Sequence, residues 1–526
     1  MATTEVKVTR GEFQNEPFLN FNDPAVRKAQ EDALAKVRSE FGRQYPLWIG
    51  GEKVETNDFL KSYNPSNPSE VLGLFHKANL DIANRAVEAA NSAFERWKRV
   101  PAAEHSEILF RAADIMRKRK YELNAWVCYE VGKTWAEADA DVAETIDFAE
   151  FYARENLRVS QPVPTNQLKG EKSVQVLIPL GVGVVIPPWN FPCAIMAGLT
   201  LAGVVVGNTV VLKPSSDSPA IAYKFLECLW EAGLPKDVIN FCPGPGASVG
   251  DTLVKHPKTR YVGFTGSKEA GLHIQEQASK TQPGQIWIKR TVLEMGGKDA
   301  IIVDDEADLD AAVEGVAVSA FGYQGQKCSA CSRAIVTKKI YNAFLDKLKA
   351  RVEKIKVGPS DEPSNYMGPV INEKSMKDIQ GYIEHGKKDG RLLTGGERVQ
   401  HPTGGWFLQP TVIADIPAKS KLEQEEIFGP VLAVIPARDF DHAIEIANDT
   451  EFGLTGGVYT KNSDKLKKAA AEFHVGNLYL NRKCTGAMVG AHPFGGFNMS
   501  GTDSKVGGRE YLLLFLQAKV VAEKLS

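Results

Sequence analysis

Residues 182–190 read Val182-Gly-Val-Val-Ile-Pro-Pro-Trp-Asn190, and residues 209–216 read Thr209-Val-Val-Leu-Lys-Pro-Ser-Ser216. Each stretch begins with a short apolar run and ends in proline and polar residues, which is typical of a buried strand that leads into a loop. The uncharged residues between them predict a helix over 193–206. A strand, a helix and a second strand at this spacing form a right-handed parallel unit. This stretch therefore predicts an α/β fold with a Rossmann-type, doubly wound parallel sheet.

The same alternation continues along the chain and extends the predicted sheet. Because ligands of such sheets bind beyond the carboxyl ends of the strands, we expect a binding site at the polar residues that follow each strand. A less regular alternation after residue 294 predicts a second α/β domain. The further elements expected in the first sheet and its cover are helix 220–232, strand 238–241, helix 248–256, strand 261–264, helix 269–279 and strand 287–293.

Length and composition limit the classes of protein that this chain can represent. At 526 residues the chain is long enough for about three domains. A net charge of −2 argues against a nucleic acid or an anionic membrane as the main partner. The uncharged run 191–212 is interrupted by Gly207-Asn208, which predicts a buried helix and a strand rather than a membrane span. Seven sparse cysteines indicate a reducing, cytoplasmic compartment and no structural metal.

The segment Phe321-Gly-Tyr-Gln-Gly-Gln-Lys-Cys328-Ser-Ala-Cys331-Ser-Arg333 places a cysteine between an amphipathic helix and a buried strand. A thiol at such a rim is accessible to a substrate and can attack a carbonyl carbon. Taken alone, the same cysteine is more often an inert apolar residue. Glu294 ends another apolar strand beside Gly296-Gly297, where it either caps the turn or faces a pocket.

Together, two motifs resemble the signatures of the aldehyde dehydrogenase superfamily, and the resemblance extends from about Leu47 to the C-terminus. Gly325-Gln-Lys-Cys328 resembles the cysteine signature, and Leu293-Glu294-Met-Gly-Gly-Lys298 resembles the glutamate signature. The resemblance implies an enzyme in which Cys328 attacks an aldehyde, Asn190 and the Cys328 N–H hold the oxyanion, and Glu294 activates water. The intermediates would be a thiohemiacetal and a thioester on Cys328.

The resemblance also implies a nicotinamide cofactor. Ser216 stands where many relatives that prefer NAD carry a glutamate that repels the 2′-phosphate of NADP, so we expect NAD as cofactor with NADP tolerated. The glycine pattern 244–250 is one residue away from the usual dinucleotide fingerprint and by itself is equally consistent with a simple turn. The residues expected to bind the cofactor are Ile186, Pro188, Trp189, Lys213, Ser215, Ser216, Gly246, Gly250, Phe264, Gly266, Ser267, Gly296, Glu426 and Phe428.

Substrate contacts are expected next to the nucleophile and in the loop Thr485-Gly486-Ala487. Ser329, Gly486 and Ala487 resemble the substrate-carboxylate contacts of the branch of the superfamily that oxidises L-glutamate γ-semialdehyde to L-glutamate in proline catabolism. A hydroxyl and successive backbone N–H groups suit an anion. Phe191 and Phe494 would be the apolar walls. The alternative is that Gly486-Ala487 is only a tight turn and the pocket admits another aliphatic aldehyde or semialdehyde.

Three rival functions differ in single residues. Relatives that acylate coenzyme A typically lack the glutamate, so Glu294 favours hydrolysis of the thioester. A Cys-His hydrolase would require a histidine, and neither of the two motifs contains one. A structural homologue without activity would be expected to lack Cys328 or Glu294, and both are present. The resemblance further implies a homo-oligomer, a dimer or an assembly of dimers, joined by a β-hairpin arm. The predicted divisions are an N-terminal extension (1–46), a cofactor domain (47–157 and 181–293), the arm (158–180 and 502–526) and a catalytic domain (294–501).

Overall fold

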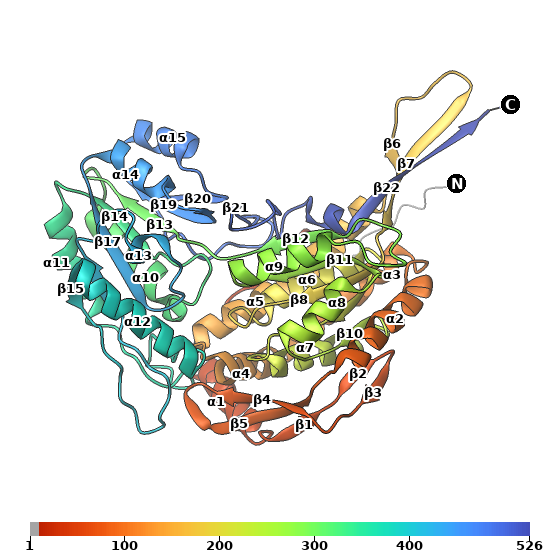
Figure 1. Ribbon diagram of the computed structural model, residues 1–526, viewed down its shortest axis with the longest axis horizontal. Helices are drawn as coiled ribbons and strands as arrows, with labels where there is room; N and C mark the ends of the chain where they lie inside the picture. Colours follow the sequence, from red (N-terminus) through yellow and green to blue (C-terminus); the bar gives the residue numbers. More distant parts are fainter. Residues whose placement is uncertain (1–9, 526) are drawn as a thin grey trace.

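A computed structural model describes residues 10–525 of the protein (Figure 1). The first of its two seven-stranded sheets has the strand order β12-β11-β8-β9-β10-β2-β3, and the five strands from β12 to β10 are parallel. The order reverses at β8, so the loop after β8 lies at the point where such sheets bind ligands. The strands are β2 (Leu47–Ile49), β3 (Glu52–Val54), β8 (Val182–Ile186), β9 (Thr209–Leu212), β10 (Ile239–Phe241), β11 (Thr259–Thr265) and β12 (Arg290–Glu294).

Helices cover both faces of this sheet, as the prediction of a doubly wound fold requires. The expected split of residues 191–212 is confirmed, because a helix ends at Val205, Gly207 turns the chain with φ 96°, and β9 follows. Within residues 10–525, none of the helices combines the length and the apolar character that a membrane crossing needs. One face carries α3 (Ala102–Lys118), α5 (Trp135–Val159), α6 (Ala194–Val205) and α7 (Pro219–Glu231), and the other carries α2 (Leu80–Trp97), α8 (Asp251–Lys255) and α9 (Lys268–Ser279).

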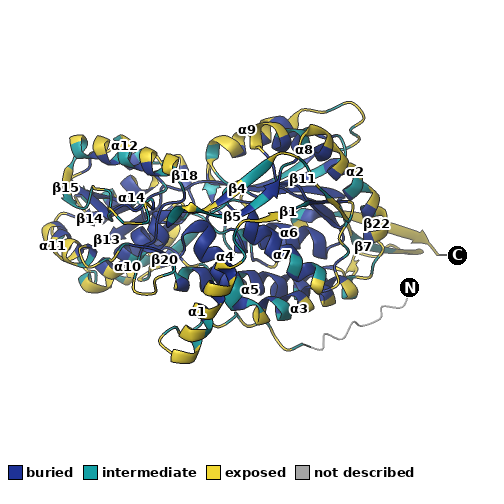
Figure 2. Cartoon of the chain, turned by 90° about the horizontal axis from the view of Figure 1, so that it is seen from below, coloured by how far each residue is buried: buried dark blue, intermediate teal, exposed yellow. Residues whose placement is uncertain are grey.

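The second sheet has the order β15-β16-β17-β14-β13-β19-β20 and is parallel except for its edge strand β15. Its buried residues form one apolar cluster on each face. Figure 2 shows the buried residues of the chain in dark blue and the exposed residues in yellow. The strands are β13 (Ala300–Val303), β14 (Arg333–Thr337), β15 (Arg391–Thr394), β16 (Thr411–Ala414), β17 (Val431–Ala437), β19 (Thr455–Tyr459) and β20 (Asn477–Leu480). The helices are α10 (Leu309–Phe321), α11 (Tyr341–Val352), α12 (Glu373–Asp389), α13 (Lys421–Gln424), α14 (Phe440–Asn448) and α15 (Ser463–Glu472).

A three-stranded arm projects from the body of the molecule (Figure 1). The last strand, β22, pairs with β7 along its whole length, from Leu516 opposite Pro179 to Lys524 opposite Glu171. The sequence placed this strand near 513–521; it starts at Leu516 because residues 511–515 form a 3₁₀ turn. The domain boundaries stay a prediction. The arm consists of β6 (Val163–Pro164), β7 (Glu171–Pro179) and β22 (Leu516–Lys524).

The remaining elements complete the two ends of the fold. Asp23 caps α1 by accepting the N–H of Ala25, and this helix packs against α4. These elements are α1 (Pro24–Arg38), α4 (Lys120–Val131), a sheet of β1 (Arg43–Tyr45), β4 (Phe59–Asn64) and β5 (Asn67–His76), and a pair of β18 (Phe452–Gly453) and β21 (Phe497–Asn498).

Candidate active site

The cysteine loop follows the end of α10 in a turn with unusual backbone angles. Tyr323 and Gln324 have φ of 50° and 55°, in the left-handed region that side chains other than glycine rarely adopt. Tertiary hydrogen bonds hold this conformation: the Tyr323 hydroxyl donates to the Val131 carbonyl at 3.0 Å, and the Gln324 amide donates to the Pro369 carbonyl at 2.8 Å. A strained turn fixed in this way positions Cys328 at the rim of a cavity.

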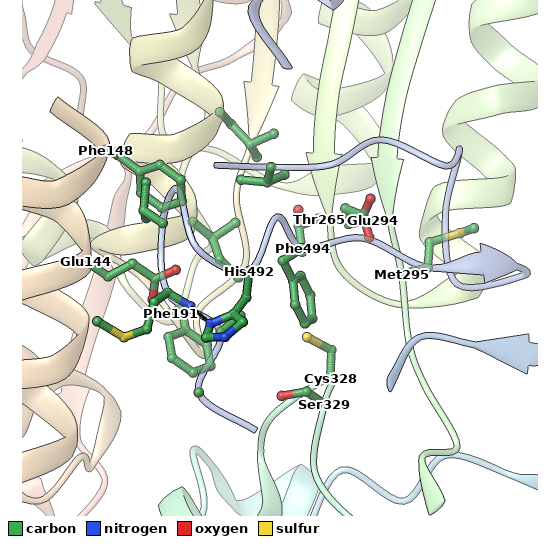
Figure 3. Close-up of a pocket in the computed structure, with 17 residues that line it drawn as sticks. Glu144, Phe148, Phe191, Thr265, Glu294, Met295, Cys328, Ser329, His492 and Phe494 are labelled. Atoms are coloured by element: carbon green, nitrogen blue, oxygen red, sulfur yellow. Dashed lines mark hydrogen bonds between the residues drawn. The ribbon is translucent and has the colours of Figure 1, made fainter. Parts of the chain in front are cut away.

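The half-buried Cys328 side chain faces a cavity that is partly open to solvent (Figure 3). Burial raises the pKa of the Cys328 thiol well above its usual value, and the carboxyl groups of Asp299, Glu426 and Glu294 add to this effect. The N–H of Ser329 opposes it by hydrogen bonding to the sulfur. The thiol is therefore protonated at neutral pH and becomes a nucleophile only when it loses its proton.

Glu294, the last residue of β12, lines the same cavity. Its Oε1 accepts the Ser504 hydroxyl at 2.7 Å, and its Oε2 accepts the Gly496 N–H at 3.3 Å. Burial nevertheless raises the pKa of Glu294 to about 8, because these two hydrogen bonds only partly offset the loss of solvation. A carboxyl group with a pKa near the working pH can both release and take up a proton during catalysis.

Asn190 is held beside the cysteine loop. It follows β8 at the reversal of strand order, and its Nδ2 donates to the carbonyl oxygen of Gln326 at 3.1 Å. The side chain is only 3% exposed and does not itself line the cavity. The structure thus brings Asn190 to the loop that carries Cys328, two residues before the nucleophile.

The predicted substrate residues all lie in the wall of this one cavity: Phe191, Ser329, Gly486, Ala487 and Phe494. The loop that follows β20 contributes Gly486 and Ala487 to this wall. Arg482 binds the carbonyl oxygens of Thr485 and Gly486, both at 3.1 Å. Among residues 10–525, the N–H groups of Gly486 and Ala487 have no hydrogen-bond partner. They are therefore free to bind an anion.

Glu144 and His492 are polar residues that line the cavity and were not predicted from the sequence. Glu144 of α5 lines the cavity on the side of Phe191 (Figure 3), and burial raises its pKa to about 8. An acidic residue within a mostly buried helix carries no motif that could have identified it. His492 also lines the cavity, and its Nδ1 accepts the N–H of Met488 at 3.3 Å. Within the described chain His492 forms no hydrogen bond with Cys328, so the geometry gives no support to a Cys-His hydrolase.

Ser504 was missed as well, since it lies in the range 502–526 that the sequence assigned to the arm. Its hydroxyl binds Glu294, and the loop is tied to β12 by the N–H of Thr502, which donates to the carbonyl oxygen of Leu293 at 2.9 Å. Serine is too common a residue type for sequence position alone to indicate this contact.

Cys331 and Cys484 lie behind the cavity wall, among buried residues of the second sheet. The N–H of Cys331 binds the carbonyl oxygen of Ser319, and the N–H of Cys484 binds the hydroxyl of the same serine. The thiol of Cys484 donates to the carbonyl oxygen of Ser329 at 3.4 Å. Cys484 therefore joins the loop of Gly486 to the loop of the nucleophile.

On the other side of the nucleophile, Lys213 lies at the carboxyl end of β9 and is 5% exposed. Its ammonium group donates to one acceptor, the Pro214 carbonyl oxygen at 3.3 Å, and burial lowers its pKa to about 8. A Cβ on Gly250 would lie 3.7 Å from the Lys213 side chain, while a Cβ on Gly246 would meet open space. A buried cation with unused donors beside open backbone is suited to the hydroxyl and phosphate groups of a nucleotide.

The glycine pattern adopts a different structure from the predicted helix 248–256. Residues 246–250 form a single π-helical turn, and α8 begins only at Asp251. Ser267 caps α9, because its hydroxyl accepts the N–H of Ala270 at the start of the helix. The other residues expected to bind the cofactor, Ile186, Pro188, Trp189, Ser215, Ser216, Phe264 and Gly266, lie in or directly after β8, β9 and β11.

Glu426 and Phe428 approach from the second domain. The Gly297 N–H donates to Glu426 Oε1 at 3.0 Å, and a Cβ on Gly296 would lie 2.1 Å from the same carboxylate. A side chain at position 296 would therefore displace the Glu426 carboxylate. The Phe428 ring meets Trp189 edge to face, with 5.5 Å between ring centroids. This contact joins the loop after β8 to the second domain.

Comparison with known proteins agrees with this geometry. The Aldehyde dehydrogenase family matches residues 48–521. The chain is 55% identical over 511 residues to 1-pyrroline-5-carboxylate dehydrogenase of Geobacillus thermodenitrificans, covering 97% of this chain and 99% of that one. A crystal structure of 1-pyrroline-5-carboxylate dehydrogenase from Thermus with bound NAD superposes with a TM-score of 0.97 at 51% identity and covers 98% and 100% of the two chains. Betaine aldehyde dehydrogenase from Staphylococcus aureus in complex with NAD⁺ gives a TM-score of 0.87 at 30% identity, covering 94% and 97%.

Proposed function

The chain belongs to the aldehyde dehydrogenase family, and we propose that it oxidises L-glutamate γ-semialdehyde, the open-chain form of 1-pyrroline-5-carboxylate, to L-glutamate. The cofactor is NAD, and the reaction is a step of proline catabolism. The identities of 50 to 55% to curated relatives named for this substrate support the proposal.

One observation carries the assignment: a single cavity is lined by Cys328 and by Gly486 and Ala487, whose N–H groups form no hydrogen bond within residues 10–525. The aldehyde carbon reaches the thiol while the carboxylate of the amino-acid head binds these amides and the Ser329 hydroxyl. Glu144 lines the same cavity, where the substrate ammonium group would favour the ionised form of its carboxyl group and pair with it. A simple aliphatic aldehyde would leave these polar groups without partners, which lowers its affinity.

In the first half of the reaction the Cys328 thiolate attacks the aldehyde carbon and forms a thiohemiacetal. Asn190 uses one amide N–H to bind Gln326 beside the cysteine loop, and its second N–H, together with the Cys328 N–H, would stabilise the oxyanion. Loss of such a donor typically costs about 3 kcal/mol of activation free energy. The aromatic rings of Phe191 and Phe494 pack beside the carbon chain and exclude water from the thiol.

The residues at the strand ends fit the cofactor. Lys213 has unused donors for the ribose hydroxyls, and Ser267 with the first N–H groups of α9 suits the pyrophosphate. Glu426 and Phe428 would hold the ribose and the ring of the nicotinamide end. NAD, when bound, would supply the acceptor for the hydride of the thiohemiacetal carbon, and loss of this hydride leaves a thioester on Cys328.

In the second half, Glu294 takes a proton from a water molecule that attacks the thioester carbon. The carbon–sulfur bond breaks, the carboxylic acid leaves, and the Cys328 thiol is restored. A carboxylate with a pKa of about 8 is a stronger base than an exposed glutamate, which suits this step.

We further infer that the enzyme works in the cytoplasm as a homo-oligomer, either a dimer or an assembly of dimers. Seven free cysteines, six of them buried, suit a reducing compartment. The arm supports an oligomer because it leaves Val520 and Val521 61% and 45% exposed on a strand that projects from the body.

The test is a product analysis with purified enzyme, NAD and L-glutamate γ-semialdehyde. We expect one L-glutamate and one reduced cofactor for each aldehyde consumed, measured by mass spectrometry and absorbance. Reduced cofactor without L-glutamate, or no turnover of this aldehyde while simple aldehydes are oxidised, would refute the proposed function.

A further inference from the structure

An extended N-terminal segment, residues 10–22, crosses α5 and reaches the loop that carries Gly486 and Ala487; we refer to this segment as the strap. The strap precedes α1 and lies outside the cofactor and catalytic motifs. Its central polar residue is Asn15, whose side-chain amide donates to the Val489 carbonyl oxygen at 3.0 Å and to Asp147 Oδ2 at 2.7 Å.

Helix α5 places the strap and the substrate cavity on adjacent faces. Glu144 and Phe148 line the cavity, while Asp147 and Phe151, at the same four-residue spacing, contact the strap. Asp147 binds the strap twice, because its Oδ1 also accepts the N–H of Glu16 at 2.6 Å. The strap is therefore fixed to the helix that contributes Glu144 to the cavity.

The strap also packs against the loop beyond its amides. Phe13 lies edge to face with Phe151 at 5.2 Å between centroids. A Cβ on Gly490 would lie 3.2 Å from both rings, so the backbone of this glycine rests against the aromatic pair. Gly490 has φ 77°, and its N–H donates to the carbonyl oxygen of Gly507 at 2.9 Å. The carboxyl end of the loop is thus held by the strap on one side and by residue 507 on the other.

From these contacts we infer that Asn15 is a positioning residue that holds the 486–490 loop and thereby strengthens binding of substrates that carry a carboxylate. The inference rests on the proposed function, because the loop is taken as the carboxylate site. Val489 lies two residues after Ala487 and itself lines the cavity, so the bond from Asn15 to its carbonyl oxygen fixes the carboxyl end of the loop. Arg482 fixes the other end through the carbonyl oxygens of Thr485 and Gly486. Loss of the Asn15 donor leaves the carboxyl end of the loop less constrained, and an anion must then order it on binding.

The test compares Asn15→Ala with wild type on two aldehydes, L-glutamate γ-semialdehyde and propanal, which has no carboxylate. We expect KM for the semialdehyde to rise about 3- to 10-fold, the effect of one lost hydrogen bond, with kcat unchanged and both propanal parameters unchanged. Calorimetry should show the same increase in Kd for L-glutamate. Asn15→Asp keeps the size of the side chain but lacks the N–H donor, so it should raise KM for the semialdehyde at least as much as Asn15→Ala does.

Glu16→Gln is the matched control, because it weakens a strap contact with Arg117 that does not reach the loop. It should leave KM for the semialdehyde unchanged. Three results would overturn the inference while the wild-type preference for the semialdehyde stands. Asn15→Ala could change the kinetic parameters of both aldehydes equally, it could leave KM for the semialdehyde unchanged, or Glu16→Gln could raise that KM as much as Asn15→Ala does. A wild-type enzyme without that preference would overturn the proposed function and the inference together.

Discussion

At the residue scale, Cys328 and Cys331 differ in access rather than in chemistry. Cys328 faces the cavity, whereas Cys331 is 1% exposed and its thiol donates to the Arg333 carbonyl oxygen at 3.3 Å. Cys328→Ala should abolish aldehyde oxidation, and Cys331→Ala should retain most of it, measured as formation of reduced cofactor. Equal loss in both variants would contradict the assignment of the nucleophile.

Glu294 should control the rate of thioester hydrolysis. Because burial raises its pKa to about 8, its base form is the minor form at neutral pH, and the steady-state rate should increase as the pH rises through about 8. Glu294→Gln should lose this increase and stall turnover, while rapid mixing still records reduced cofactor in the first turnover. If that first turnover also disappears, the glutamate acts before hydrolysis.

Ser504→Ala provides the control for this pH dependence. The Ser504 hydroxyl stabilises the charged form of Glu294 and so lowers its pKa, which means that its removal should move the increase in rate to higher pH. A shift to lower pH would show that another group determines the profile.

At the scale of elements, the turn between α10 and Cys328 depends on Gly325. Its φ is 66°, and an added Cβ would lie 2.3 Å from the Gly429 carbonyl oxygen, a backbone atom that cannot rotate away. Gly325→Ala should reduce the free energy of unfolding by roughly 1 to 3 kcal/mol and lower kcat by displacing Cys328. Chemical denaturation and initial rates measure the two effects.

Gly381 is the matched control, since it lies in α12 with no atom within 4 Å of an added Cβ. Gly381→Ala should stabilise the protein by about 0.5 to 1 kcal/mol without changing kcat. If Gly325→Ala changed neither the free energy of unfolding nor kcat, the turn would not constrain the nucleophile.

The same elements explain what the sequence could and could not predict. β8, β9 and α6 are contiguous apolar segments, so their pattern alone indicated the parallel sheet, which the structure confirms. The motifs around Cys328 and Glu294 are also contiguous. Asn15, Glu144 and Ser504 act through contacts with segments far away in the sequence, and no local pattern encodes such contacts. The π turn 246–250 likewise depends on how the chain packs around Lys213 and Val249.

At the scale of the whole molecule, the arm should determine assembly. Val520 is 61% exposed on β22, and a charge there would oppose burial against a second copy. Val520→Glu should shift the protein toward smaller species in sedimentation velocity. Leu392→Glu, at a half-exposed leucine on β15 far from the arm (Figure 1), should leave the assembly unchanged. Identical sedimentation of both variants and wild type would contradict an interface at the arm.

The whole account depends on one cavity that binds an aldehyde at Cys328 and a carboxylate at Ser329 and the Gly486–Ala487 amides. The most direct measurement is kcat/KM for L-glutamate γ-semialdehyde, succinic semialdehyde and propanal, with wild type and Ser329→Ala. Wild type should prefer L-glutamate γ-semialdehyde, and Ser329→Ala should lower kcat/KM for that substrate by about 10-fold or more, the effect of a lost hydrogen bond to a charged group, with propanal unchanged. Equal kcat/KM for propanal and the semialdehyde in wild type would contradict the account.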